Sequence, residues 1–257
     1  MVSLFHIEFS ERLDAIATIT LFATHCFPSL YYTNKTMTEL IQNFKDGFVG
    51  LFYGIRRSGK TTLTVKLLND FWLDWYGADN IYLFYPQVHS PDSQYNLVGL
   101  NPDNCLDHYD ETIVDKLFEI QAAKVMNGTS KRILVILDDC ISEAGFSKRG
   151  TQTVLAKIAA EGRHKKYSLI VASQYYAAFN TTLRSNADLA FIWRSYGEGF
   201  DHACKVFRPI DKKDFKPLML SVKKEHAFIY IDYVRRVIWR YDPDNVTFTK
   251  VVDFGGD

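Results

Sequence analysis

The chain has 257 residues, 47% of them apolar and 23% charged, which suits one α/β domain and excludes a mainly disordered chain or a coiled coil. The formal charge is zero overall, yet residues 1–127 carry a net charge of −6 and residues 128–257 one of +6. This asymmetry fits a polyanion-facing surface in the C-terminal half, with scattered solvated charge as the alternative.

The first 36 residues are interpreted as an N-terminal extension, and Met37 opens a domain predicted to span residues 37–257. Residues 15–34 carry no formal charge and are long enough to cross a bilayer, but they include His25 and Pro28. Acidic residues precede them where a signal peptide needs positive charge, so no membrane association is expected. The four cysteines form no CxxC pair, so neither zinc nor a disulfide framework is expected.

The remaining sequence alternates between short apolar runs and segments of helical periodicity. Strands are expected at residues 48–53, 80–85, 131–137, 168–173 and 188–193, and helices at residues 59–75, 111–125 and 151–161. Residues 86–110 are rich in Pro, Asp, Asn and Ser and predict a long loop, and residues 226–241 predict an antiparallel β-hairpin. Strands that alternate with helices indicate an α/β fold with a mainly parallel sheet between helical layers.

A phosphate-binding motif, GIRRSGKT, stands between the first predicted strand and the first predicted helix. Its glycines let backbone N–H groups wrap a phosphate chain, and the helix N-terminus adds partial positive charge. Lys60 is expected to reach the β- and γ-phosphates, and the Thr61 hydroxyl is expected to bind Mg²⁺. The predicted nucleotide-binding residues are Gly54, Arg56, Arg57, Ser58, Gly59, Lys60, Thr61 and Thr62.

Two carboxylates follow the strongest strand signal, KRILVIL. In proteins with such a loop, an acid in the place of Asp138 completes the Mg²⁺ shell through water. A second carboxylate beside it, Asp139, can activate a water for attack on the γ-phosphate. This pair is typical of ATP hydrolases more than of nucleotide kinases. The alternative for Asp139 is a cap on the segment that follows.

Gln174 and Arg163 complete the predicted catalytic set. Gln174 ends the SLIVAS strand and would face the γ-phosphate if that strand lies between the Lys60 strand and the Asp138 strand. Arg163 opens the cationic run RHKK and could act as an arginine finger toward a neighbouring subunit. The alternatives are an ordinary polar strand end for Gln174 and a solvated loop or phosphate patch for Arg163.

Together, GIRRSGKT, KRILVILDD, GRHKKYSLIVASQ and LRSNADLAFIW resemble the HerA/FtsK superfamily of P-loop ATPases. Within that superfamily, the chain is most similar to the poxvirus-type genome-packaging ATPases of large DNA viruses and virophages. In the superfamily an arginine precedes the apolar strand that ends in the glutamine, as Arg163 precedes Gln174. Residues 183–186 also look like the segment that follows the glutamine strand in the family. The resemblance covers residues 48–193.

The resemblance implies a RecA-like domain with Mg²⁺-dependent ATPase activity that assembles as a ring, with a hexamer expected. ATP would lie between subunits, with Arg163 supplied in trans. The ring would pump double-stranded DNA into a capsid with little sequence preference, and capsid or portal proteins would be its partners. The pore loops would come from residues 86–110 or 146–150. The protein would occur in the cytoplasm or virus factory of a host and in the virion.

One departure from the pattern concerns the second motif. Cellular relatives carry Asp-Glu there, whereas this chain has Asp138-Asp139, a pair that is compatible with the viral branch. Two other functions fit the same phosphate-binding motif. The first is a nucleotide or nucleoside kinase, and the second is a capsid-associated protein that binds ATP only structurally.

Overall fold

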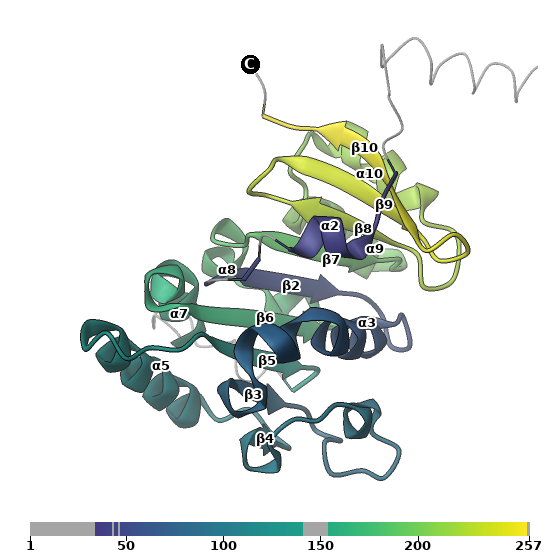
Figure 1. Cartoon of the computed structure of the whole chain (residues 1–257). Helices are drawn as coiled ribbons and strands as arrows, with labels where there is room; N and C mark the ends of the chain where they lie inside the picture. Colours follow the sequence, from purple (N-terminus) through teal and green to yellow (C-terminus); the bar gives the residue numbers. More distant parts are fainter. Residues whose placement is uncertain (1–33, 43, 46, 141–153, 256–257) are drawn as a thin grey trace, which may run out of the picture. The chain divides into compact units, whose positions relative to one another are not determined.

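The computed structural model describes residues 34–42, 44–45, 47–140 and 154–255, all within the compact unit Asn34–Asp257 (Figure 1). The strands are β1 (Asn34–Lys35), β2 (Val49–Tyr53), β3 (Ile81–Phe84), β4 (Cys105–Leu106), β5 (Ile133–Asp138), β6 (Tyr167–Ser173), β7 (Leu189–Trp193), β8 (Phe228–Asp232), β9 (Val237–Asp242) and β10 (Thr247–Asp253). The α-helices are α2 (Met37–Ile41), α3 (Lys60–Leu67), α4 (Leu73–Tyr76), α5 (Glu111–Met126), α7 (Val154–Glu161), α8 (Thr181–Ser185), α9 (Gly197–Val206) and α10 (Lys212–Ser221).

These strands form one ten-stranded sheet in the order β1-β10-β9-β8-β7-β2-β6-β5-β3-β4. The six strands from β7 to β4 are parallel, and β8, β9, β10 and β1 continue the sheet in antiparallel pairs. Strand β6 lies between β2 and β5, with Leu169 opposite both Val49 and Val135. The carboxyl ends of β2, β6 and β5 therefore meet at one edge of the sheet.

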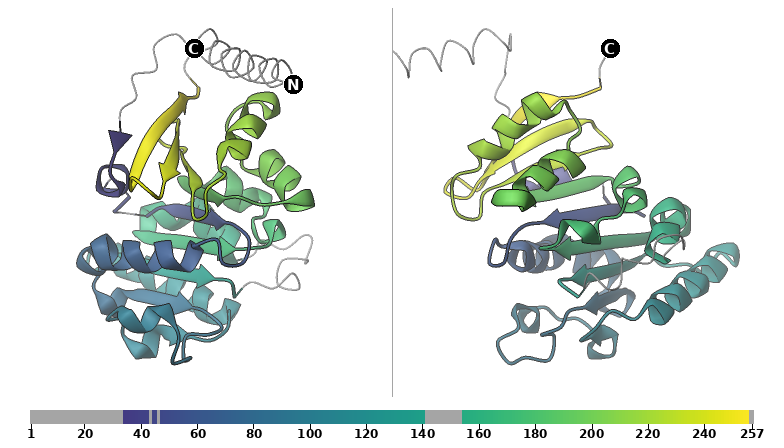
Figure 2. Two further views of the ribbon diagram at one scale, coloured as in Figure 1. Left: turned by 90° about the vertical axis from the view of Figure 1, so that its right-hand side faces the viewer. Right: turned by 180° about the vertical axis from the view of Figure 1, so that it is seen from behind.

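Alternating strand residues pack against helices on the two faces of the sheet, because successive side chains of a strand point to opposite sides. One face carries Leu51, Val135 and Leu169 against α5, α7, α8, α9 and α10. The other carries Phe52, Ile136 and Ile170 against α2, α3 and the helical segment that follows α3. Figure 2 shows this arrangement of helices on both sides of the sheet.

The predicted α/β fold, the parallel strands and the C-terminal hairpin of β8 and β9 are all present. The helix expected at residues 59–75 is interrupted by a π-helical turn, Leu68–Trp72, before α4. The wider turn leaves Leu68, Phe71 and Trp72 buried against the sheet, where a regular helix would rotate this stretch out of register. The helix expected at residues 151–161 is described from Val154 onward.

Several elements have no counterpart in the sequence predictions. They are the edge strands β1 and β4, the strand β10 beside β1, and the helices α2, α8, α9 and α10. Strand β10 carried a usable signal, since TFTKVVD is rich in β-branched residues and follows the turn residues Asp242 to Asn245. Among the described residues, no helix is long and apolar enough to cross a bilayer.

Candidate nucleotide-binding and catalytic site

The predicted phosphate-binding loop connects β2 to α3, and its glycines are required by local geometry. A Cβ on Gly54 would lie 2.5 Å from Ser58 Oγ and 2.8 Å from Trp193 Cβ, so a larger residue would collide with both. Gly59 has a φ of +105°, a conformation that L side chains rarely adopt. The loop therefore delivers the first turn of α3, with its free backbone N–H groups, to the carboxyl edge of the sheet.

The Lys60 side chain is 4% exposed and lies inside this loop. Its Nζ donates to the carbonyl oxygens of Gly54 (2.9 Å) and Ile55 (3.3 Å), and it lies 3.6 Å from Asp139 Oδ2. This ammonium group is therefore held between the loop and the second carboxylate of the DD pair. Phosphate oxygens placed in the loop would meet a positive charge that is already oriented.

Asp138 ends β5 directly beside the first turn of α3 and is fully buried. Its Oδ2 accepts hydrogen bonds from the Thr61 hydroxyl (2.8 Å) and from the hydroxyl of Tyr95 (2.8 Å). Burial, and then the negative charge of Asp139, raise the pKa of Asp138 to about 6. The site therefore favours a nearby cation, which would keep this carboxylate ionised.

The donor set around Asp138 fits a hydrated Mg²⁺ ion. Asp138 Oδ1 is buried and accepts no hydrogen bond within the described part of the chain, while the Thr61 hydroxyl lies at the neighbouring oxygen. A metal-bound water would supply the missing donor to Oδ1, and Thr61 with phosphate oxygens would supply hard ligands. The described residues contain no cluster of three or more His, Cys, Asp or Glu that could hold a metal alone, so phosphate oxygens would have to complete the shell.

Asp139 and Gln174 are brought together at the ends of β5 and β6. The backbone N–H of Gln174 donates to Asp139 Oδ1 (3.1 Å), and the Asp139 N–H donates to Ala172 O (2.9 Å). Asp139 has a φ of +47°, an uncommon conformation that Asp tolerates better than most residues. Strand β6 does lie between β2 and β5, as the prediction for Gln174 required.

The remaining predicted loop residues lie on the rim of the site. Arg56, Arg57 and Thr62 are exposed, and the Thr62 hydroxyl donates to Gln94 Oε1 (3.1 Å). Gln94 belongs to a short 3-10 turn, Gln94–Leu97, inside the predicted long loop. This loop packs on α3 and supplies Tyr95 to Asp138, so the loop is part of the site.

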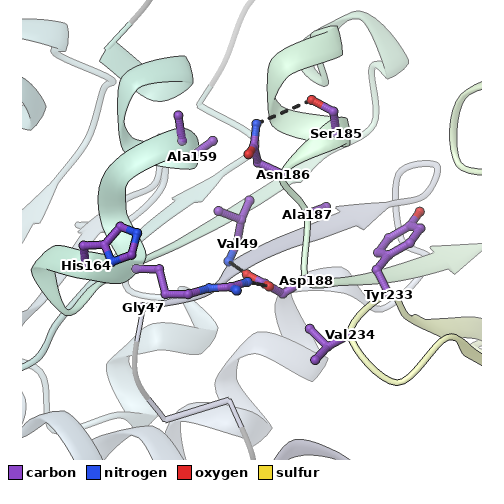
Figure 3. A pocket seen from close by; sticks show the side chains of 12 residues that line it. Gly47, Val49, Ala159, His164, Ser185, Asn186, Ala187, Asp188, Tyr233 and Val234 are labelled. Carbon is purple, nitrogen blue, oxygen red and sulfur yellow. Dashed lines mark hydrogen bonds and ion pairs between the residues drawn. The ribbon is translucent and has the colours of Figure 1, made fainter.

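Arg163 lies away from this site, near the amino ends of β2 and β7, whereas the phosphate-binding loop follows the carboxyl end of β2. Its guanidinium pairs with the carboxylate of Asp188, which precedes β7 and also accepts from the backbone N–H of Val49 (2.9 Å) at the start of β2. Figure 3 shows Asp188 beside Val49 in a hollow of about 450 Å³ at the amino ends of these strands. Arg163 is therefore placed away from the phosphate-binding loop of its own chain.

The segment at residues 183–186, which the family resemblance singled out, reaches the same hollow. Ser185 and Asn186 line it together with Asp188 (Figure 3). A Cβ on Gly47 would lie 2.4 Å from Arg163 Cα, so close packing also fixes the Arg163 backbone there. A structural role for Arg163, in neutralising the nearly buried Asp188, is thus visible within one subunit, while its action in trans stays a prediction.

Replacing Arg163 with alanine should destabilise the fold in a pH-dependent manner. Burial already raises the pKa of Asp188, and losing Arg163 raises it further. The folded variant then retains a proton that the unfolded chain releases at a pH of about 3.9. The native chain loses that proton at the lower of the two folded pKa values of Asp188, so the stability of the variant relative to the native chain should fall as pH rises above the pKa of Asp188 in the folded native chain. The loss should be about 1 kcal/mol at pH 7, since Arg163 is solvent-exposed and its charge is screened.

Urea unfolding at pH 5 and pH 8 measures this effect. The double variant Arg163→Ala/Asp188→Asn is the control, since without the carboxylate the extra pH dependence should disappear. Arg163→Lys should recover most of the stability. If the free energy of unfolding changes by the same amount between pH 5 and pH 8 in Arg163→Ala and in the native chain, the ion pair does not stabilise the fold.

Two site residues were missed by the sequence analysis. Tyr95 stands in a loop, 43 residues before Asp138, and only the folded chain shows that the two meet. His226 precedes β8, has a φ of +61°, and places Nδ1 3.2 Å from the carbonyl oxygen of Ser58. Its signal was its place at the start of the predicted hairpin, but nothing local to it indicated contact with the phosphate-binding loop.

The phosphate-binding loop, the buried Asp138 and the strand order together identify the fold as that of the P-loop nucleoside triphosphatases. The fold is shared with the DNA-packaging ATPase B204 from Sulfolobus Turreted Icosahedral Virus, with a TM-score of 0.58 and 19% identity over 77% of this chain and 98% of that chain. It is also shared with the genome-packaging NTPase B204 of Sulfolobus turreted icosahedral virus 2 in complex with AMPPCP, with a TM-score of 0.57, 16% identity and the same coverage. The expected resemblance to viral packaging ATPases is thus confirmed at the level of fold.

Sequence similarity extends to proteins of large DNA viruses. The chain is 28% identical over 139 residues to uncharacterized protein 015R of Frog virus 3 (isolate Goorha), a match that covers 52% of this chain and 42% of that protein. It is 26% identical over 133 residues to uncharacterized protein 088R of Invertebrate iridescent virus 3, covering 50% and 49%. The chain thus spans less than half the length of these two relatives. No family model matches the sequence.

Proposed function

We propose that the chain is an Mg²⁺-dependent ATPase that translocates double-stranded DNA, as the packaging of a viral genome requires. The observation that carries this proposal is the position of β6 between β2 and β5. That strand order brings Asp139 and Gln174 to the carboxyl edge where Lys60 and Thr61 would hold the phosphates. The shared fold of the viral packaging ATPase B204 supports the same function.

The residues of the site suit hydrolysis of the terminal phosphate. Lys60 and the backbone N–H groups of the loop would bind the β- and γ-phosphates, and Thr61 and Asp138 would hold the metal ion, which neutralises phosphate charge. Asp139 would accept a proton from the water that attacks the γ-phosphorus. The bond to the β,γ-bridging oxygen breaks, and ADP and inorganic phosphate leave. Gln174 would contact the γ-phosphate.

The assembly and the DNA path belong to the same proposal. Residues 37–257 would form the ATPase domain and residues 1–36 an extension. The active form would be a hexameric ring, with Arg163 acting on the neighbouring subunit. Capsid or portal proteins would be partners, in the virion and in the host compartment where it is assembled. Of the two predicted pore segments, residues 86–110 pack beside the nucleotide site, and residues 146–150, with Lys148 and Arg149, lie outside the described residues.

The steady-state ATPase rate, measured with and without duplex DNA, tests this function. Duplexes of unrelated sequence should stimulate the rate equally. The stimulation should fall as salt rises, because the DNA-binding constant falls with a log–log slope of about 0.9 for each phosphate contact. Lys148→Ala/Arg149→Ala should lower the stimulation and leave the DNA-free rate unchanged. A salt-insensitive rate that DNA does not alter, measured on an assembled ring, would contradict the proposal. Turnover that instead needs a small phosphate acceptor would indicate a nucleotide or nucleoside kinase.

A further inference from the structure

An aromatic hollow of about 350 Å³ opens beside the phosphate-binding loop, between α3 and the C-terminal strands. Gly59 and Thr62 form its border with the loop, and Trp193, Phe228, Tyr241 and Phe248 supply its aromatic walls. These rings come from four neighbouring strands, β7 to β10. The hollow is therefore a product of the antiparallel extension of the sheet, joined to the same loop that would hold phosphates.

The direction of a bound nucleotide follows from the strand order. The γ-phosphate end must face Asp139 and Gln174, which lie at the ends of β5 and β6 on one side of β2. The nucleoside must then leave the loop on the other side of β2, toward β7 and β8. The aromatic hollow lies on that side, and it begins at Thr62, one residue beyond the Thr61 that would bind the metal.

The chemistry of the walls suits a flat heteroaromatic ring. Tyr241 stacks on Phe228 with a centroid distance of 4.5 Å and an interplanar angle of 16°, and lies 5.0 Å from Phe248. Phe228, Phe248 and Trp193 are buried, whereas Tyr241 is partly exposed and presents the accessible part of this stack. Stacking on such a surface accepts any base, and a purine offers more area than a pyrimidine.

A second hollow, also of about 350 Å³, shares Trp193 and His226 with the first but has a different character. It is lined by Arg56, Arg57 and Arg194, among other cations, and Arg194 lies over the ring of Tyr196, 4.6 Å from its centroid. Guanidinium groups suit phosphate or carboxylate oxygens. The aromatic hollow is also lined by Lys66 and Asp70, but these two form an ion pair with each other (2.8 Å). It is thus the better site for an uncharged base.

We infer that the aromatic hollow between α3 and β7–β10 binds the purine ring of the nucleoside triphosphate, with Tyr241 as its stacking residue. The inference rests on the proposed function, because it needs the phosphates in the loop. His226 separates the two hollows, and its contact with Ser58 O fixes the loop against the start of β8. The contact that joins the base site to the phosphate site, between His226 and Ser58, thus links residues that are 168 positions apart in the sequence.

Equilibrium binding of ATP and of inorganic tripolyphosphate to the full chain tests the inference, because the second ligand lacks a base. Native protein should bind ATP more tightly than tripolyphosphate. Tyr241→Ala should weaken ATP binding about tenfold, the loss typical of one stacking aromatic, and leave tripolyphosphate binding unchanged. Tyr241→Phe keeps the ring and should bind ATP as the native chain does. Equal affinity of the native chain for the two ligands would overturn the inference.

Tyr196→Ala is the matched control, since it removes the same kind of side chain from the cationic hollow. If Tyr196→Ala weakens ATP binding and Tyr241→Ala does not, the base lies in the cationic hollow and the inference is wrong. Lys60→Ala should bind neither ATP nor tripolyphosphate. If the native chain itself binds neither ligand, the proposed function is refuted instead.

Photolabelling of native protein with 8-azido-ATP needs no variant and covers the case in which Tyr241→Ala fails to fold. The label should appear in the peptide that contains β8 and β9. A label confined to residues 194–196 or 223–225 would contradict the inference.

Discussion

Lys60→Ala should abolish ATP hydrolysis, with a loss of turnover of about 10³-fold, while the chain stays folded. The ammonium group is oriented by two loop carbonyls and by Asp139, and all three contacts lie within the site. Removing it deletes the positive charge that would stabilise the β- and γ-phosphates in the transition state. Turnover is measured by phosphate release, and folding by circular dichroism.

Lys124→Ala is the appropriate control for Lys60→Ala. This lysine is exposed in the last turn of α5, on the far face of the sheet from α3, and its loss should leave turnover unchanged. Native turnover in a folded Lys60→Ala chain would remove the assignment of the loop as the phosphate site.

Asp139→Asn should retain Mg·ATP binding and lose turnover by about 10²- to 10⁴-fold, the contribution typical of a general base. An asparagine can still accept the hydrogen bond from the Gln174 backbone through Oδ1, so the geometry should be kept. The amide cannot take the proton of the attacking water. Nucleotide binding by calorimetry and turnover by phosphate release separate the two effects.

Asp138→Asn provides the contrast to Asp139→Asn, because Asp138 accepts a hydrogen bond from the Thr61 hydroxyl and is proposed to hold the metal. It should raise the Mg²⁺ concentration needed for half-maximal rate, whereas Asp139→Asn should not. An Asp139→Asn chain that hydrolyses ATP at the native rate would show that another group activates the water. Asp139 would then serve only to hold the backbone N–H of Gln174.

The parts of the site that could be predicted are those specified by local sequence. The loop from Gly54 to Thr61 is continuous in the chain, and its glycine spacing reflects backbone conformations that few other sequences need. Asp138 ends the apolar strand ILVILD and Gln174 directly follows the strand YSLIVAS, so their placement at the carboxyl edge follows from these strands. The position of β6 between β2 and β5 stayed a condition of the Gln174 prediction, because a parallel sheet does not by itself fix which strands are neighbours.

The missed features depend on contacts between distant segments. Tyr95 meets Asp138 because residues 86–104 fold back over α3, and no periodicity marks that path. The ion pair of Arg163 with Asp188 joins the end of one helix to the start of a strand 25 residues later. Strand β10 is partly exposed and lies near the margin of the sheet, between β1 and β9, where neighbouring contacts decide structure more than propensity does.

The long loop has a mechanical consequence. Two adjacent residues of it, Gln94 and Tyr95, bond Thr62 and Asp138, at 3.1 and 2.8 Å. A displacement of the loop by about 1 Å would stretch both bonds beyond the range of a hydrogen bond. Any displacement of the loop therefore acts directly on Asp138, the carboxylate proposed to hold the metal, and a change in what Asp138 binds acts directly on the loop.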